Sequence, residues 1–144
     1  MTLVDVNLLY YATVPAMAHH HRAREWLDRK LNGGDRVGLP WESLLAFTRL
    51  AANPKVTTPQ CTVAQAWLIV QAWLDCPNVF IPCPAPNHRE IFQTLLNAVV
   101  PMTHKLVPDA HLAAIAIGNN LTLASADTDF ARFPGLRYEN PLVE

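Results

Sequence analysis

Cysteine is scarce in this sequence. Its 144 residues include three cysteines, Cys61, Cys76 and Cys83. The number is odd and the spacing is not that of a structural zinc site, which argues against a disulfide framework and against a zinc finger. Thiols stay reduced in the cytoplasm, and we expect these three to be reduced core residues of a cytoplasmic protein.

Long apolar runs are also missing. No stretch approaches the roughly 20 apolar residues that a membrane-spanning helix needs. Residues 1–5 carry no basic leader and no small-residue cleavage site, and the sequence has no repeat, low-complexity tract or linker. Because 51% of the residues are apolar, the chain can bury a core, and we expect one domain over residues 1–144 and no membrane contact.

An excess of basic residues is the third absence. Eleven Lys and Arg against 12 Asp and Glu give a formal net charge of −1, whereas proteins that bind the phosphates of nucleic acids are normally basic. This balance argues against nucleic acid only where the acids are spread over the surface. Where acids are collected around a metal cation, the cation reverses the local sign.

The acidic residues are placed at the ends of predicted elements. Asp5 follows an apolar run, Glu42 and Asp109 each begin a predicted helix, and Asp127 and Asp129 follow another apolar run. Clustered carboxylates repel one another unless a cation holds them together. Hard divalent cations prefer oxygen ligands, and carboxylate-held Mg²⁺ or Mn²⁺ commonly cleaves phosphate esters. The pattern therefore predicts a metal-dependent nuclease.

Apolar runs and helical periodicity alternate along the chain, which predicts an α/β fold. Strands joined through helices form right-handed crossovers and hence a mostly parallel sheet. A turn-rich loop is expected over 54–59. The expected strands are 2–6, 36–39, 79–81, 121–124 and 136–138, and the expected helices are 8–12, 19–31, 41–52, 62–74, 87–98 and 108–117, with a short turn or helix at 127–133.

Two of the helices carry predicted N-terminal capping boxes, in which the first and fourth residues bond each other's backbone. One box joins Thr62 to Gln65, and the other joins Asn87 to Glu90. In the helix after the first box, the apolar spacing predicts an inward face of Trp67, Val70 and Leu74.

The predicted topology brings the acids together. Ligands of open parallel sheets bind beyond the carboxyl ends of the strands. Asp5 and Asp127 directly follow predicted strands, while Glu42 and Asp109 start helices, where the helix dipole favours a carboxylate. We therefore expect these four side chains to meet at one edge of the sheet.

Four motifs resemble the PIN domain of VapC toxins, the ribonucleases of prokaryotic toxin–antitoxin pairs. They are LVDVN at residues 3–7, ESLLAFTR at 42–49, PDAHLAA at 108–114 and ADTDFARFPGL at 126–136. Each is weak alone, but the four occur in the family's order and cover the chain nearly end to end. The resemblance implies a PIN-like three-layer domain with a mostly parallel sheet of about five strands flanked by helices.

The resemblance also implies roles for the acids. Asp5 and Asp109 correspond to the main metal ligands, and Asp127 to a further ligand, either direct or through water. Glu42 corresponds to a carboxylate that supports the metal or orients the attacking water. No acidic position of the family pattern is missing. Asp129 either joins this catalytic set or caps the short helix around it.

Two more polar residues follow from the same resemblance. Asn7 corresponds to the small polar residue beside the first aspartate, where a hydrogen bond would hold the Asp5 carboxylate. Arg49 lies nearly two helical turns after Glu42, so the two share a helix face. It either pairs with the acids or contacts a substrate phosphate.

The implied activity is that of a metal-dependent endoribonuclease, the toxin of a type II toxin–antitoxin module. Water activated by Mg²⁺ or Mn²⁺ would attack a phosphodiester in line and leave a 3′-hydroxyl and a 5′-phosphate. The RNA would be single-stranded or a loop, as in structured tRNA or rRNA, because bases are accessible there. The resemblance further implies a VapB-type antitoxin partner and a toxin homodimer.

Large apolar side chains are abundant in two of the predicted helices. We expect part of this surface to form a groove for an antitoxin helix and the extended stretch after it. The resemblance implies that the same antitoxin places an arginine against the carboxylates. The apolar residues concerned are Trp26, Leu27, Leu31, Leu44, Leu45 and Phe47.

Other conspicuous residues have ordinary interpretations. The consecutive histidines at 19–21 point in different directions on a helix, so we expect them to be solvated rather than metal-bound. His111 is two residues beyond Asp109 and is expected to face away from that carboxylate. Trp41 is the tryptophan of most interest, because it precedes Glu42.

Two alternatives from other classes remain open. A haloacid-dehalogenase-type phosphatase also has an acid after its first strand, but its chemistry requires Asp-x-Asp, and Asn7 stands in place of the second aspartate. A non-catalytic module could use the acidic pocket to accept a partner's arginines. Cleavage of RNA that needs Mg²⁺ and stops with EDTA would separate a nuclease from both.

Overall fold

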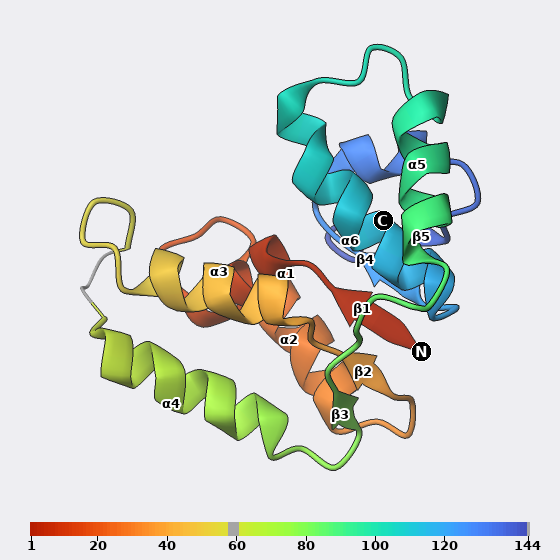
Figure 1. Ribbon diagram of the computed structural model, residues 1–144. Helices are drawn as coiled ribbons and strands as arrows, with labels where there is room; N and C mark the ends of the chain where they lie inside the picture. The colour runs from red at the N-terminus through yellow and green to blue at the C-terminus, as the bar shows by residue number, and fades with distance from the viewer. Residues whose placement is uncertain (58–60, 144) are drawn as a thin grey trace.

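The computed structural model describes residues 1–57 and 61–143, which form one five-stranded sheet with helices around it (Figure 1). All neighbouring strands are parallel, in the order β3-β2-β1-β4-β5. The predicted α/β class and five-stranded parallel sheet are confirmed. The strands are β1 (Thr2–Val4), β2 (Val37–Gly38), β3 (Val79–Phe80), β4 (Thr122–Ala124) and β5 (Tyr138–Glu139).

The helices follow the predicted order closely. The 3-10 helix η2 occupies the expected short element at 127–133. The α-helices are α1 (Val6–Thr13), α2 (His20–Leu31), α3 (Trp41–Ala51), α4 (Val63–Leu74), α5 (His88–Ala98) and α6 (Val107–Gly118), and the 3-10 helices are η1 (His104–Leu106) and η2 (Thr128–Arg132).

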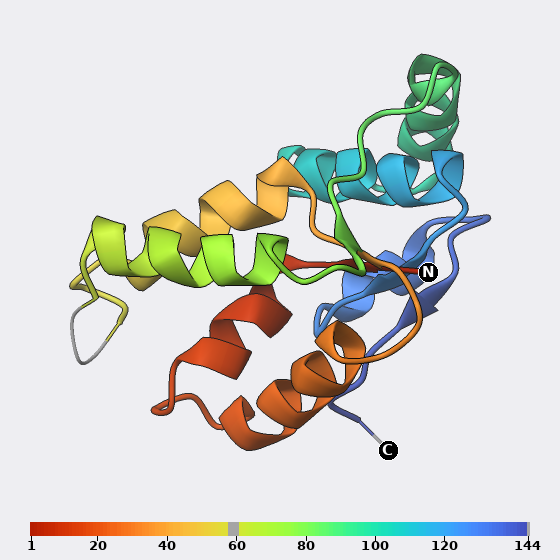
Figure 2. The same cartoon turned by 90° about the horizontal axis from the view of Figure 1, so that it is seen from below.

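The helices form layers on the two faces of the sheet. Figure 2 shows α1 and α2 on one face and α5 and α6 on the other, while α3 and α4 extend past the carboxyl end of β1. Adjacent residues of β1 serve opposite faces: Val4 packs in the cluster that includes α1–α4, and Leu3 packs in the cluster of α5 and α6. This alternation follows from the two-residue repeat of a strand. No helix in the described ranges is both long and apolar enough to cross a bilayer.

The start of α1 differs from the prediction for a local reason. A strand was expected over 2–6 and a helix from Leu8, but β1 ends at Val4 and α1 begins at Val6. Asp5 is the N-cap, and its Oδ1 accepts a hydrogen bond of 2.8 Å from the Val6 amide. The predicted loop at 54–59 is described as far as Thr57, and its last two residues lie outside the described residues.

One of the two predicted capping boxes is present. The Thr62 hydroxyl accepts a hydrogen bond of 3.1 Å from the Gln65 amide, and the Gln65 side chain accepts one of 2.9 Å from the Thr62 amide. The second box is wrong. Asn87 has φ −96° and ψ 20° rather than the extended backbone of a cap, and it makes no side-chain cap bond.

The inward face of α4 is turned relative to the prediction. Ala66, Val70 and Trp73 are buried, and Trp73 packs its ring against Phe47 at 4.7 Å between centroids. Trp67 was expected inside, but it is 37% exposed and stacks on Trp41 instead. Periodicity alone does not distinguish these two faces, because bulky residues occur on both.

The cysteines are free, as predicted, but they are not core residues. Cys61 and Cys76 are half-buried and Cys83 is exposed. Cys61 precedes the cap of α4, Cys76 follows the end of α4, and Cys83 lies in the loop before α5. The ends of helices and loops lie at the surface, which explains the exposure.

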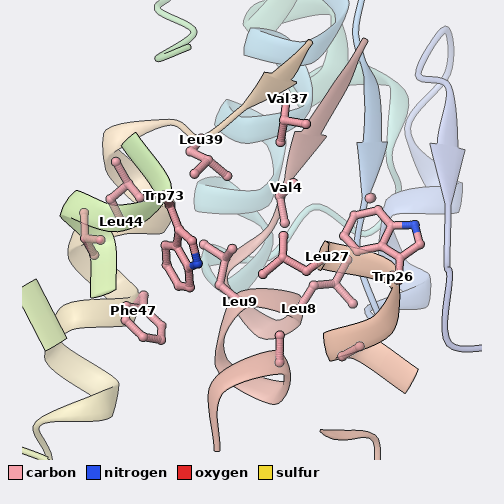
Figure 3. Close-up of a cluster of buried hydrophobic side chains, with 14 of the residues drawn as sticks. Val4, Leu8, Leu9, Trp26, Leu27, Val37, Leu39, Leu44, Phe47 and Trp73 are labelled. Carbon is pink, nitrogen blue, oxygen red and sulfur yellow. The ribbon is translucent and has the colours of Figure 1, made fainter. Parts of the chain in front are cut away.

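Most of the residues expected to line an antitoxin groove belong to the core instead (Figure 3). Trp26 is 7% exposed, and Leu27, Leu44 and Phe47 are fully or almost fully buried around α1. Leu45 is 60% exposed. The apolar side chains of α2 and α3 pack with those of α1 in one core cluster, so they are buried inside the domain.

We predict that Trp26→Ala lowers the free energy of unfolding by about 3 to 5 kcal/mol, because it leaves a large cavity. The matched variant Leu45→Ala removes an exposed side chain on α3 and should change it by less than about 0.5 kcal/mol. Urea unfolding followed by circular dichroism measures both. Equal losses in the two variants would contradict the assignment of Trp26 to the core.

Candidate active site

The predicted acids lie where strands end and helices begin. Asp5 connects β1 to α1, and Glu42 and Asp109 lie in the first turns of α3 and α6. Asp127 caps η2, and Asp129 lies in its first turn. Because β1 and β4 are parallel neighbours, their carboxyl ends place Asp5 and Asp127 at the same edge of the sheet.

A small open cavity of about 200 Å³ joins three of these acids. Asp127 and Asp129 are not part of its lining, but their charges act on Asp109, and the charge of Asp127 also acts on Asp5. The structure therefore brings the predicted acids to one place. The lining residues are Asp5, Val6, Glu42, Ser43, Ala46, Pro108, Asp109, His111 and Leu112.

The Asp5 carboxylate is fixed by three donors. Its Oδ1 accepts from the Val6 amide, while its Oδ2 accepts from the Ser125 hydroxyl at 2.7 Å and from the Asn7 amide nitrogen at 3.3 Å. The bond from Asn7 is the one expected from the sequence. Asn7 also accepts a bond of 3.2 Å from the backbone amide of Ala126, so it spans the ends of β1 and β4.

Ser125 is a site residue that the sequence analysis missed. It is fully buried, and its hydroxyl accepts bonds of 3.0 Å from the Asn7 side chain and from the Asp127 amide while donating to Asp5. One donor and two acceptors exhaust the capacity of a hydroxyl group. A small hydroxyl residue directly after a buried strand and before the acid was the signal available in the sequence.

Burial and nearby negative charge raise the pKa values of two of these carboxyls, Asp109 and Asp5. Desolvation is the main cause for Asp109, followed by the charges of Asp127, Asp5 and Asp129, and together they raise its pKa to about 6. Desolvation also raises the pKa of Asp5, against the bonds from Ser125 and Val6. As bare anions the carboxylates are unfavourable neighbours, and a cation would relieve that cost.

Basic side chains do not neutralise the cavity. Within the described residues, no Lys or Arg forms an ion pair with Asp5, Glu42, Asp109 or Asp127. Arg49 is exposed and makes no ion pair with them in the described part of the chain, so the first of its two expected roles is not observed. Its contact with a substrate phosphate stays a prediction.

The helix-capping role considered for Asp129 in η2 belongs to Asp127. Asp127, rather than Asp129, caps this helix, because its Oδ1 accepts a bond of 2.9 Å from the Asp129 amide. Asp129 lies 3.8 Å from Arg132. The capping interpretation of Asp129 is therefore wrong.

The histidines differ in part from expectation. His111 was expected to be a surface or partly buried histidine that faces away from Asp109. It is half-buried, and its Nε2 lies 2.5 Å from Glu42 Oε2, a contact that was not expected. Sequence spacing along α6 did not reveal this contact, because Glu42 lies 69 residues away on α3. In the 19–21 run, His20 Nδ1 contacts the Tyr11 carbonyl at 2.8 Å, and His21 pairs with Glu25 at the surface.

The donor chemistry of the cavity fits a hard divalent cation. Among the described residues, no three Asp, Glu, His or Cys side chains are already grouped as metal ligands. A cation at this cavity would therefore draw the carboxylates toward one another.

Comparison with known proteins identifies the family. No family model matches the sequence. The chain is 38% identical to Ribonuclease VapC37 of Mycobacterium tuberculosis over 98% of the chain and 97% of that protein. It is 37% identical over the full length of both chains to Ribonuclease VapC33 of the same organism. The chain belongs to the VapC ribonuclease family.

Solved structures share the VapC fold. VapBC2 from Rickettsia felis, bound to a DNA fragment from its promoter, has a TM-score of 0.67 at 16% identity and covers 96% of this chain and 97% of that one. A toxin–antitoxin complex from Klebsiella pneumoniae has a TM-score of 0.66 at 18% identity and covers 98% of each chain. The predicted PIN-like architecture is confirmed, and the haloacid-dehalogenase alternative is removed by membership of the VapC family.

We predict that Asp109→Asn stabilises the metal-free protein at pH 7.5 by about 1 to 2 kcal/mol. The folded pKa of Asp109, about 6, lies above the ordinary value of 3.8, so ionisation opposes folding. This cost is full above pH 6 and fades as the pH falls toward 4. Unfolding in EDTA at pH 7.5 and pH 4.5 should show the gain shrinking at the lower pH.

The control for this prediction is Asp75→Asn, which removes an exposed acid at the end of α4. It should change stability by only a few tenths of a kcal/mol at either pH. A gain from Asp109→Asn that is the same at both pH values would contradict the raised pKa.

Proposed function

We propose that this protein is a Mg²⁺- or Mn²⁺-dependent endoribonuclease and the toxin of a toxin–antitoxin pair, active as a single domain in the cytoplasm. The observation that carries the proposal is the cavity that joins Asp5, Glu42 and Asp109 beside Asp127, in a chain whose relatives are ribonucleases. The substrate is RNA with accessible loops, such as tRNA or rRNA, because unstacked bases are accessible to a protein there.

Asp5, Asp109 and Asp127 are the residues that would hold the cation. A bound divalent cation would supply positive charge against the phosphate oxygens and lower the pKa of a water molecule. Ser125 sets the spacing of two of these ligands, because it donates to the Asp5 carboxylate and accepts from the Asp127 amide. Burial and, after it, the charges of the neighbouring carboxylates raise the pKa of Asp109, which supports a shared cation at this place.

Glu42 has a different task in this scheme. It enters from α3, on another element than the three aspartates, and His111 occupies its Oε2. Its Oε1 has no hydrogen-bond partner among the described residues and can accept a proton from the attacking water. Arg49, exposed on the same helix, would contact a flanking phosphate, and Asp129 would act through its charge on Asp109.

We predict that Asp5→Asn abolishes RNA cleavage and reduces the rise in melting temperature that Mg²⁺ or Mn²⁺ causes in the wild type. Any ligand that binds the native state alone raises its stability. Asparagine retains an oxygen for the Val6 amide, so the fold should persist. Cleavage products with 5′-phosphate ends, and their loss with EDTA, complete the measurement.

The control is again Asp75→Asn, which should cleave RNA at the wild-type rate. Full activity of Asp5→Asn, or of the wild type in EDTA, would overturn the proposed mechanism. A wild type that binds arginine-rich peptide but cuts no RNA under any metal would indicate the non-catalytic acidic module instead.

The partner proposed for this chain is a VapB-type antitoxin, and the toxin is proposed to pair with a second copy of itself. Solved fold neighbours include a toxin–antitoxin complex. We predict that coexpression with its VapB-type antitoxin gives a stable complex with suppressed RNase activity, because an antitoxin arginine placed against the carboxylates excludes the cation. Purification of the two proteins together with undiminished RNase activity would contradict this.

A further inference from the structure

A chain of hydrogen bonds runs from the cavity to a helix that lines no part of it. Glu42 Oε2 contacts His111 Nε2 at 2.5 Å, and His111 Nδ1 contacts His88 Nε2 at 3.0 Å. The three residues come from α3, α6 and α5. The chain therefore links helices that pack in the two different core clusters of the molecule.

The directions of these bonds follow from the two ends of the hydrogen-bond series. The Glu42 carboxylate only accepts, so His111 Nε2 donates to it, and a neutral His111 then accepts at Nδ1. At the other end, His88 Nδ1 is buried and has no hydrogen-bond partner among the described residues, which agrees with an unprotonated nitrogen there. His88 therefore carries its proton on Nε2 and donates to His111 Nδ1. His111, as the acceptor at Nδ1, carries its own proton on Nε2 and donates to Glu42.

Packing fixes the rings of both histidines. The His88 ring stacks on Phe92, with centroids 6.1 Å apart and 7° between the planes. The His111 ring meets His88 edge-on at 4.9 Å and Phe92 edge-on at 6.5 Å. Because this packing already orders both rings, the hydrogen bond from His111 to Glu42 does not have to offset the conformational entropy of ordering them.

A second His–Glu pair of this protein, on the surface of α2, lacks this packing. His21 and Glu25 lie 3.2 Å apart on α2, with 89% and 64% of their side chains exposed, and the His21 ring has no stacking partner in the described part of the chain. Such surface pairs contribute little. The His111–Glu42 pair differs in its fixed ring and in its second histidine.

We propose that His111 and His88 are positioning residues of the cleavage reaction. His88 sets the tautomer of His111, and His111 holds Glu42 by Oε2, which leaves Oε1 as the oxygen that receives the proton of the attacking water. This inference rests on the proposed nuclease function. Without the bond, the side chain of Glu42 moves among rotamers in solvent, and the productive geometry is populated less often.

The test compares variants at position 111 that differ in reach. His111→Gln keeps an amide N–H at the distance of the imidazole Nε2, whereas His111→Asn is too short to reach Glu42. His111→Phe keeps the ring and its packing but donates nothing. We expect kcat to fall about 10- to 100-fold in His111→Phe and His111→Asn, with KM for RNA nearly unchanged and most of kcat retained in His111→Gln.

His88→Phe tests the outer bond, because the new ring can still stack on Phe92. We expect a smaller loss of kcat than in His111→Phe, together with a change of the His111 tautomer. Nitrogen-15 NMR of the metal-free wild type should show Nε2–H tautomers for both histidines, and His111 should gain Nδ1–H character in His88→Phe. The control His21→Phe should leave kcat and both spectra unchanged.

Several outcomes would overturn the proposal. They are wild-type kcat in His111→Phe, equal losses in His111→Gln and His111→Asn, and an Nδ1–H tautomer of His111 in the wild type. If His111→Phe fails to fold by circular dichroism, the comparison of Gln with Asn still decides. If the wild type cuts no RNA, the proposed nuclease function fails, and the positioning role fails with it. If the wild type cuts RNA but the variants keep its kcat, only the positioning role fails.

Discussion

Repulsion among carboxylates is the constraint around which this molecule is organised. The carboxyl ends of two neighbouring parallel strands and the first turns of two helices deliver Asp5, Asp127, Glu42 and Asp109 to the same edge of the sheet. Burial, and after it the charges of the other aspartates, raise the pKa of Asp109 to about 6, so ionisation of this group opposes folding in the absence of a cation. Such local strain is common at active sites, where stability is exchanged for chemistry.

The rest of the structure holds this unfavourable group in place. The strands are short. One backbone bond from the Asp5 amide to the Ala124 carbonyl continues the pairing of β1 with β4, and side chains extend it further: Asn7 accepts from the Ala126 amide, and the Ser125 hydroxyl donates to Asp5. Two cores on opposite faces of the sheet anchor the elements that carry the acids. The Ser125 hydroxyl makes all the hydrogen bonds that it can, and a fully bonded polar network is rigid. This rigidity holds the carboxylates in place against their mutual repulsion.

Sequence reasoning succeeded where signals are local. Each acid sits at the end of a strand or the beginning of a helix, and both positions can be recognised within a few residues, as at Asp5 and Asp109. It failed where the partner is distant. Ser125 contacts a residue 120 positions earlier, and His111 contacts one 69 positions earlier, so the sequence does not identify either partner. It also failed where two faces of a helix are both apolar, as in α4, and where apolar helices cover each other, as around Trp26.

The dual use of Asp5 limits how this protein can lose activity. One oxygen of its carboxylate begins α1 by capping the Val6 amide, and the other belongs to the cluster of acids. Among replacements, only residues that are tolerated at a helix N-cap leave the start of α1 intact, which favours Asn, Ser, Thr and Gly. An inactive descendant of this chain would therefore keep one of those four at position 5, whereas hydrophobic replacements would also fray α1. The residue found there in any silenced copy records whether its fold was still under selection.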